Sequence, residues 1–166
     1  MAIIKPNNNT ISAITALPAA ITTGKVLQVV TATYTSSGST NSTSYAESGL
    51  TVNITPSSSS SKVYVSSSIG AYGYISSNGP RNFYIQLKRG STTIAEKQTQ
   101  IESGTGARGL NMDTLDGVLI ALDSPSSTSE QTYKVGGYLD SAADSSVLQF
   151  NSNNGPATIT VMEISA

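Results

Sequence analysis

The chain has 166 residues, of which 37% are hydrophobic and only 11% are charged, and it contains 28 Ser and 20 Thr but no His, Cys or Trp. The net charge is −1 and the nine Lys and Arg are spread along the chain, so the chain has no basic stripe to neutralise phosphates and we expect no nucleic-acid partner. Without His and Cys it cannot build a Ser-His-Asp triad, a Cys-His pair or an imidazole and thiolate zinc site. No run of about 18 apolar residues occurs, so we expect no membrane insertion.

Residues 1–23 differ from the rest in composition, because Pro6, three Asn at 7–9 and Pro18 surround a small apolar cluster. We predict an extended N-terminal arm that anchors the protein on another subunit, since a free tail this apolar would promote unwanted association. The alternative is a frayed terminus. The candidate anchoring residues are Ile3, Ile4, Ile11, Ile14, Leu17 and Ile21.

Residues 24–166 break into short β-type runs separated by Ser, Gly, Asn and Pro clusters. In the clearest run Leu50, Val52 and Ile54 alternate with polar residues, which is typical of a strand with one buried face. The expected strands are 25–35, one around Tyr45, 50–55, 62–69, 82–88, 92–99, 117–122, 131–139, 147–151 and 157–164. This number suits an all-β, antiparallel, jelly-roll-like sandwich of two packed sheets.

Two runs break this alternation, at 26–30 and at 118–122, where apolar residues occupy neighbouring positions. Such strands have two apolar faces, and the second face needs a cover that a small sandwich does not provide by itself. A symmetric neighbour is the simplest source of that cover. We therefore predict an oligomer.

The remaining chemistry is that of carboxylates, and only two sets of them lie close in sequence: Asp113 with Asp116, and Asp140 with Asp144. Either pair could form a glycosidase pair or a calcium site, but both stand in ordinary turn sequences, which favours solvated loop residues. The stretch SGTGARG lacks the Lys-Ser/Thr ending of a phosphate-binding loop. We expect no enzyme activity, no catalytic residue, no metal site and no cofactor, with glycan hydrolysis as the enzymatic alternative.

Five segments of the sequence carry a resemblance to known proteins: GKVLQVVTATYT, TSYAESGLTVNITPSSSSSKVYVSSS, FYIQLKRGSTTIA, LDSPSSTSEQTYKVGGYLD and ATITVMEISA. Over roughly residues 24–166 the chain resembles a family of phage virion domains, common in phages of aquatic bacteria and cyanobacteria and labelled tail-fibre or head-decoration proteins. The layout also looks like the trimeric jelly rolls of the complement C1q and tumour-necrosis-factor type. The resemblance implies a β-sandwich that trimerises about an axis lined by apolar and Tyr residues.

The resemblance implies a place in the virion, and two roles compete. Because only 23 residues precede the first strand, we favour a stand-alone capsid decoration, or cement, protein: a homotrimer bound to the major capsid protein on the outer capsid surface. The alternative is a tail-fibre or tailspike tip, held by tail proteins, that binds a host receptor or glycan. For host-surface glycans the candidate contacts are Tyr72 and Tyr74 in GAYGYISSNGP, with Tyr84, Tyr133 and Tyr138, since tyrosine has a flat apolar face and a polar end. The alternative to glycan contact is that several of these tyrosines line the trimer axis or a sheet face.

Overall fold

The structure is a computed structural model, which describes residues 24–166 except 76–78, 104–112, 116, 143–145 and 152–154. The described residues form twelve β-strands and no α-helix, so the expected all-β class is confirmed. The strands are β1 (Val26–Tyr34), β2 (Gly38–Thr40), β3 (Ala46–Ile54), β4 (Lys62–Ser68), β5 (Ala71–Tyr74), β6 (Gly79–Arg89), β7 (Thr92–Ser103), β8 (Asp113–Leu115), β9 (Val118–Asp123), β10 (Gln131–Leu139), β11 (Val147–Phe150) and β12 (Ala157–Ile164). In the described part of the chain, no helix is long and apolar enough to cross a membrane.

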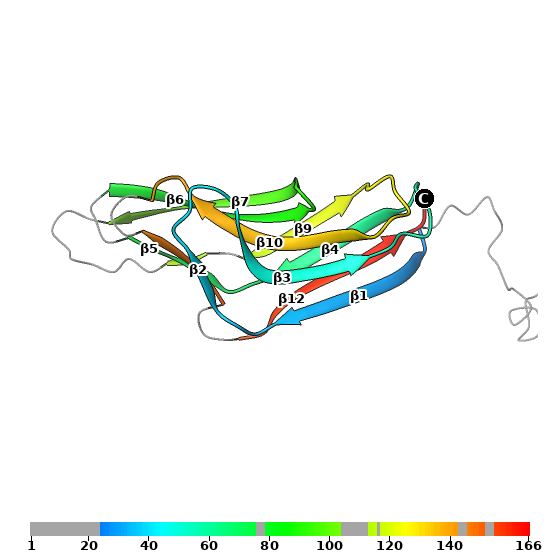
Figure 1. Cartoon of the computed structure of the whole chain (residues 1–166), viewed down its shortest axis with the longest axis horizontal. Coiled ribbons are helices and arrows are strands. Elements are labelled where there is room, and N and C mark those ends of the chain that lie inside the picture. The colour runs from blue at the N-terminus through cyan, green and yellow to red at the C-terminus, as the bar shows by residue number, and fades with distance from the viewer. Residues whose placement is uncertain (1–23, 76–78, 104–112, 116, 143–145, 152–154) are drawn as a thin grey trace, which may run out of the picture.

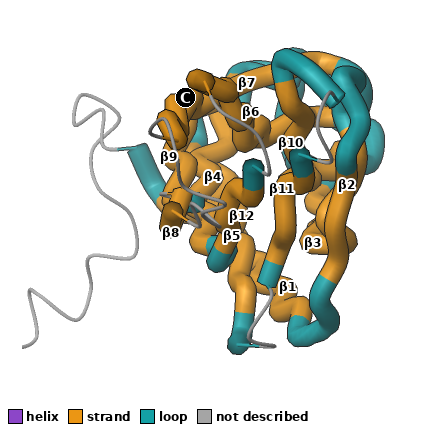
Figure 2. Tube along the Cα trace, turned by 90° about the vertical axis from the view of Figure 1, so that its left-hand side faces the viewer, coloured by secondary structure: helices purple, strands orange, loops and turns teal. Residues whose placement is uncertain are grey.

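The strands form two packed layers (Figures 1 and 2). One layer contains the sheet β1-β12-β4-β9 and the other the sheet β3-β10-β6-β7, with every neighbouring pair antiparallel. The chain passes repeatedly from one sheet to the other, as it does in jelly rolls. The predicted antiparallel sandwich is therefore confirmed.

A third sheet, β2-β11-β5-β8, continues the β1-β12-β4-β9 sheet beyond a break. Each of its strands is next in the chain to the corresponding strand of the first sheet, and the strand order is the same. The odd-numbered side chains from Val63 to Ile75 are all buried, so the alternation runs across the break at Gly70 without changing face. Residues on β4 and β5 therefore share the same inward and outward sides.

The core lies between the two layers and is formed by the inward-facing positions of both. Its largest fully buried side chains include Tyr133, Phe83 and Phe150. Val52 is 5% exposed and Ile85 2% exposed, as the alternating pattern predicted. The other buried hydrophobic residues are Leu50, Ile54, Val63, Val65, Ile69, Ala71, Ile75, Leu87, Ile101, Leu119, Val135, Leu139, Leu148, Ala157, Ile159 and Val161.

Most predicted strands match those observed, and two, 131–139 and 157–164, match at both ends. The strand expected around Tyr45 and that at 50–55 are one strand, β3, which begins at Ala46. Three short strands, β2, β5 and β8, were not predicted, because three or four residues rich in Gly, Ser or Thr give too little periodicity to identify. The arm at residues 1–23 lies outside the described residues, so the division into an arm and a sandwich stays a prediction.

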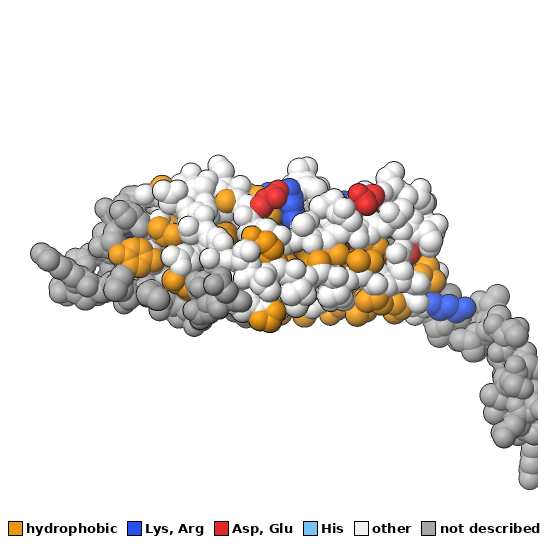
Figure 3. Space-filling view, turned by 60° about the horizontal axis from the view of Figure 1, so that its bottom comes forward, with side chains coloured by type: hydrophobic (Ala, Val, Ile, Leu, Met, Phe, Trp, Pro, Cys, Tyr) orange, Lys and Arg blue, Asp and Glu red, His pale blue; other side chains and the backbone are white. Residues whose placement is uncertain are grey.

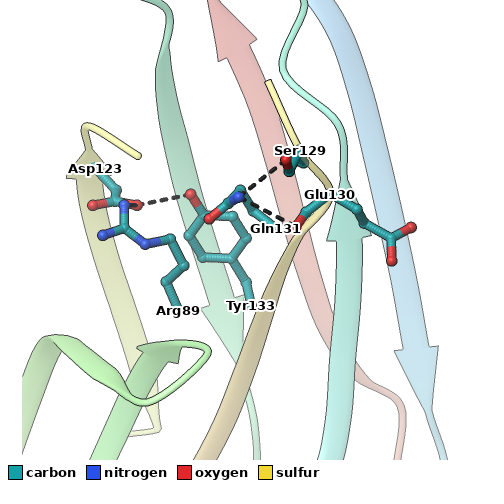
Figure 4. A network of polar contacts seen from close by, with 6 residues as sticks. All are labelled: Arg89, Asp123, Ser129, Glu130, Gln131 and Tyr133. Carbon is teal, nitrogen blue, oxygen red and sulfur yellow. Dashed lines mark hydrogen bonds and ion pairs between the residues drawn. The ribbon is translucent and has the colours of Figure 1, made fainter. Parts of the chain in front are cut away.

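A polar network connects the two sheets at one end (Figure 4). Asp123, at the end of β9, accepts a hydrogen bond from Arg89 Nη1 of β6 at 2.7 Å and another from Tyr133 Oη of β10 at 2.8 Å. Burial, and then the hydrogen bond to Asp123, raise the pKa of Tyr133 well above its ordinary value. This network fixes β9 against the opposite sheet where the strands end.

Glu163, the charged residue that is fully buried among the described residues, lies on β12 opposite Gln28 near the start of β1. Its carboxylate accepts hydrogen bonds from Gln28 Nε2 at 2.7 Å and from the backbone N and Oγ of Ser57 at 2.8 and 2.7 Å. Burial by itself raises the pKa of Glu163, but these hydrogen bonds outweigh it and lower the pKa to about 2. A buried ionised carboxylate thus connects β1, β12 and the turn after β3.

Candidate interaction surface

The outer face of the β1-β12-β4-β9 sheet, which we call the apolar face, carries the large hydrophobic side chains that the described residues leave exposed. All six lie on the two edge strands, β1 and β9, and each is about half exposed. They are Val26, Leu27, Val29, Val118, Ile120 and Leu122. The predicted second apolar face of these two strands is therefore present, and both strands present it on the same side of the sheet.

Strand register joins these edges into a continuous row. Val29 is paired with Met162, Met162 with Tyr64, and Tyr64 with Leu122, so four apolar or aromatic side chains cross the whole width of the sheet. Directly opposite side chains on one face of an antiparallel sheet are about 5 Å apart and in contact. The row is thus one surface and not four isolated side chains.

The next two rows toward the C-terminal end of β1 consist of hydroxyl side chains and end on the apolar edge of β9. Thr31, Thr160 and Ser66 lead to Ile120, and the hydroxyls of Thr31 and Thr160 are hydrogen-bonded at 3.0 Å. These side chains are small and uncharged. They would therefore let a second flat surface approach closely without removing ions from water.

Charge is distributed unequally between the two outer faces of the sandwich. Among the outward positions of β1, β12, β4 and β9 that the structure describes, Lys62 is the single charged residue. Figure 3 views the molecule from the side of β1, where hydrophobic side chains form bands and most of the visible acidic side chains gather toward the opposite sheet. That opposite sheet presents Glu47, Lys134 and Glu96, with Lys134 paired to Glu47.

Tyr72 and Tyr74 lie in strand β5, in a stretch where no strand was predicted. Because the strand has only four residues and contains Gly73, the sequence pattern did not predict it. Both tyrosines are partly exposed and point to the same outer side as the apolar face, beyond the break at Gly70. Their neighbours across the sheet are Gln149 and Val147.

The other tyrosines lie in separate environments. Tyr133 has no exposed surface and belongs to the core, so the expectation that it contacts a glycan is wrong. Tyr84 and Tyr138 are stacked against each other on the outer face of the opposite sheet, and Tyr64 lies in the apolar row. Their sequence neighbours agree with these positions, because Tyr64 and Tyr84 stand between apolar residues and point outward, whereas Tyr133 stands between polar residues and points inward.

The candidate anchoring residues of the arm, Ile3, Ile4, Ile11, Ile14, Leu17 and Ile21, lie outside the described residues. The described chain starts at Gly24, next to the end of β12. Lys25 N donates to Ser165 Oγ at 3.0 Å, and Ser165 N donates to Lys25 O at 2.9 Å. The described chain therefore begins at the β1 edge of the apolar face.

Neither of the two carboxylate pairs is described in full by the structure. Asp116 and Asp144 lie outside the described residues, and Asp140 accepts a hydrogen bond from Asn82 Nδ2 at 2.7 Å. Among the described side chains no group of three His, Cys, Asp or Glu is placed to hold a metal ion.

No protein-family model matches the chain, and no curated protein matches it. Among solved structures it is similar to the VP2 subviral particle of infectious bursal disease virus, at 16% identity over 84% of this chain and 38% of that chain, with a TM-score of 0.25. Particles with T=1 symmetry derived from the same virus match at 16% identity over 84% and 36% of the two chains, and the Gt strain at 15% over 85% and 39%, both with a TM-score of 0.27. The chain spans less than two fifths of the length of these proteins.

Proposed function

We propose that this protein is a virion structural protein that decorates the outer capsid surface of a phage as a homotrimer. In this proposal the sandwiches associate through the apolar face, and the arm at residues 1–23 binds the major capsid protein. The observation that carries the proposal is the apolar face itself. A sheet surface with half-exposed Ile, Leu and Val side chains and a single charge is suited to being covered by protein, whereas a face permanently in water would favour charged residues.

The size of the apolar face favours a closed ring over a simple pair. Four strands about 4.8 Å apart are about 19 Å wide, and the eight residues of β12 at about 3.4 Å each extend for about 27 Å. The flat outline is therefore about 500 Å², so two copies meeting through it alone would bury about 1,000 Å², below the usual range for stable interfaces. In a closed ring of three copies, each copy has two interfaces and not one, so each copy buries more surface than it would in a pair.

The arm supplies the attachment in this proposal. A fully extended segment of 23 residues reaches at most about 80 Å, which is enough to cross a neighbouring subunit and contact the shell below. Because the described chain begins at the β1 edge of the apolar face, three arms would leave the trimer close to its subunit contacts. The resemblance of the sequence to head-decoration domains agrees with this arrangement.

The experiment that tests the association is a comparison of molar mass in solution by light scattering after size-exclusion chromatography. The double variant Ile120→Lys, Leu122→Lys places charges on the β9 edge of the apolar face and should yield monomers. Its control is the double variant Thr93→Lys, Thr51→Lys on exposed positions of the other sheet, which should remain trimeric. A monomeric native protein, or a trimer unaffected by the first variant, would refute the interface.

The decoration role is tested separately with capsids that lack the protein. The native chain should bind them, and a chain without residues 2–22 should fold but not bind. A tag at the end of the sandwich, imaged on intact particles, should give density over the icosahedral shell. Failure to bind capsids at any salt concentration, or density confined to the tail, would refute decoration.

The second candidate is a tail-fibre tip that binds host glycans, and it is favoured by one observation. Tyr72 and Tyr74 are partly exposed side by side on β5, with Gln149 as a cross-strand neighbour of Tyr72. Aromatic faces next to amides can hold sugars through stacking and hydrogen bonds. The double variant Tyr72→Ala, Tyr74→Ala should then reduce binding to host cells, and unchanged binding would remove these two residues from the proposal.

A further inference from the structure

The outer face of the β10-β6-β7 strands differs from the apolar face in having an aromatic pair surrounded by amides and carboxylates. Tyr84 of β6 and Tyr138 of β10 are directly opposite in the register. Their rings are stacked with centroids 4.5 Å apart and planes 3° from parallel. Both side chains are partly exposed. The pair therefore forms one rigid aromatic block in the middle of this face.

The phenol of Tyr138 is held in a defined orientation. Its Oη donates a hydrogen bond to Glu96 Oε2 of β7 at 3.2 Å, so the side chain reaches over β6 to the edge strand. Gln86 Nε2 donates to the same carboxylate oxygen. Burial, and then the charge of Glu96, raise the pKa of Tyr138. The hydroxyl thus stays protonated at neutral pH.

A second hydrogen-bonded group flanks the aromatic block on the other side. Asn82 donates to Asp140 Oδ2 at 2.7 Å and accepts, at its Oδ1, from Gln98 Nε2 at 2.9 Å and from Gln100 Nε2 at 3.4 Å. Gln98 is the direct cross-strand neighbour of Tyr84, and Gln100 that of Asn82. The amides are therefore oriented by one another before any ligand arrives.

These groups keep unused hydrogen-bonding capacity that faces solvent. Gln98 and Gln100 are exposed and each uses one N–H of its amide in the contacts just described. A carboxamide has two N–H donors and a carbonyl acceptor, so each retains one donor and one acceptor. Donors and acceptors placed side by side, next to an aromatic surface, match the alternating hydroxyls and apolar C–H faces of a sugar ring.

We infer that the patch formed by Tyr84, Tyr138, Asn82, Gln98, Gln100 and Glu96, the saccharide face, binds a neutral oligosaccharide. A neutral ligand is favoured because Glu96 and Asp140 would repel an anionic one. Two lysines of the same sheet are engaged elsewhere, since Lys134 is paired with Glu47 and Lys88 lies over the ring of Tyr45 at 4.1 Å.

The inference rests on the proposed function in one respect: the assembly must leave this patch open to solvent. The apolar face and the saccharide face are on opposite layers of the sandwich, so an assembly that covers the first leaves the second open to solvent (Figure 1). Binding on a flat surface is expected to be weak for one copy. Several copies on one particle would multiply it through avidity.

The test uses the whole chain on an array of neutral and acidic oligosaccharides, followed by saturation-transfer NMR with the glycans retained. We expect neutral glycans to be retained, and the variant Gln98→Ala, Gln100→Ala to lower affinity by about tenfold or more, because two polar contacts are removed from an exposed edge strand where folding is little affected. Tyr84→Ala should do the same. The control Thr93→Ala, exposed on the same strand outside the patch, should bind as the native chain does.

The saccharide face is refuted if no neutral glycan binds at up to about 10 mM, where even a millimolar affinity would be detected. It is also refuted if the Gln98 and Gln100 variant binds normally, or if binding depends on Tyr72 and Tyr74 instead. Molar mass and capsid binding of each variant are measured in parallel. A variant that loses glycans and still assembles on capsids separates this inference from the proposed function.

Discussion

Glu163 offers a direct measurement of how a buried charge holds this sandwich together. Its carboxylate has no exposed surface and accepts hydrogen bonds from Gln28 and Ser57. These bonds exist only in the folded chain and lower the pKa from 4.5 to about 2. By linkage that difference corresponds to about 3 kcal/mol of folding free energy.

The direction of the pH dependence follows from the lowered pKa. Because the folded protein binds the proton less readily than the unfolded chain, the stabilisation is complete above pH 4.5 and is lost as the pH falls toward 2. Glu163→Gln cannot ionise and should lack this contribution at every pH. The difference between the two proteins should therefore be about 3 kcal/mol at pH 7 and close to zero near pH 2.

The assay is urea unfolding followed by circular dichroism at several pH values and at one fixed protein concentration, since self-association would couple concentration to stability. Glu130→Gln, at an exposed position, serves as the control and should change little at any pH. A difference between native protein and Glu163→Gln that stays constant from pH 7 to pH 2 would show that the hydrogen bonds to Gln28 and Ser57 do not favour the ionised form.

Three further predictions concern the core and the contacts between the sheets. Tyr133→Phe removes the 2.8 Å hydrogen bond to Asp123 and should lower the free energy of unfolding by about 1.5 kcal/mol, and urea unfolding that matches the native protein would contradict this. Gly136→Ala should cost about 2 kcal/mol or more, because its Cβ would overlap the carbonyl oxygen of Ala46; Gly70→Ala, which meets nothing within 4 Å, should be nearly neutral by the same assay. Val52→Asp buries an unpaired charge at a position 5% exposed and should abolish folding, so a soluble protein with cooperative unfolding would show the core assignment to be wrong.

The sequence by itself determined the fold class and much of the strand pattern. Period-two alternation is local, so Leu50, Val52 and Ile54 identified one inward face without knowledge of any neighbour. The same local pattern predicted that the runs 26–30 and 118–122 carry two apolar faces, which the structure confirms at β1 and β9. Strands of three or four residues were missed because they are too short for a period to be detected.

Only the tertiary structure decided which side chains meet. Val29, Tyr64, Leu122 and Met162 are far apart in the chain, and the register of three strand pairs aligns them in one row. Register likewise brings Tyr84 of β6 and Tyr138 of β10 directly opposite each other, so that their rings stack on the outer face. Local periodicity fixes the side of a strand to which a residue points, whereas strand pairing is a long-range property that determines its neighbours. The two candidate surfaces are products of that pairing, and so the sequence alone could not delimit them.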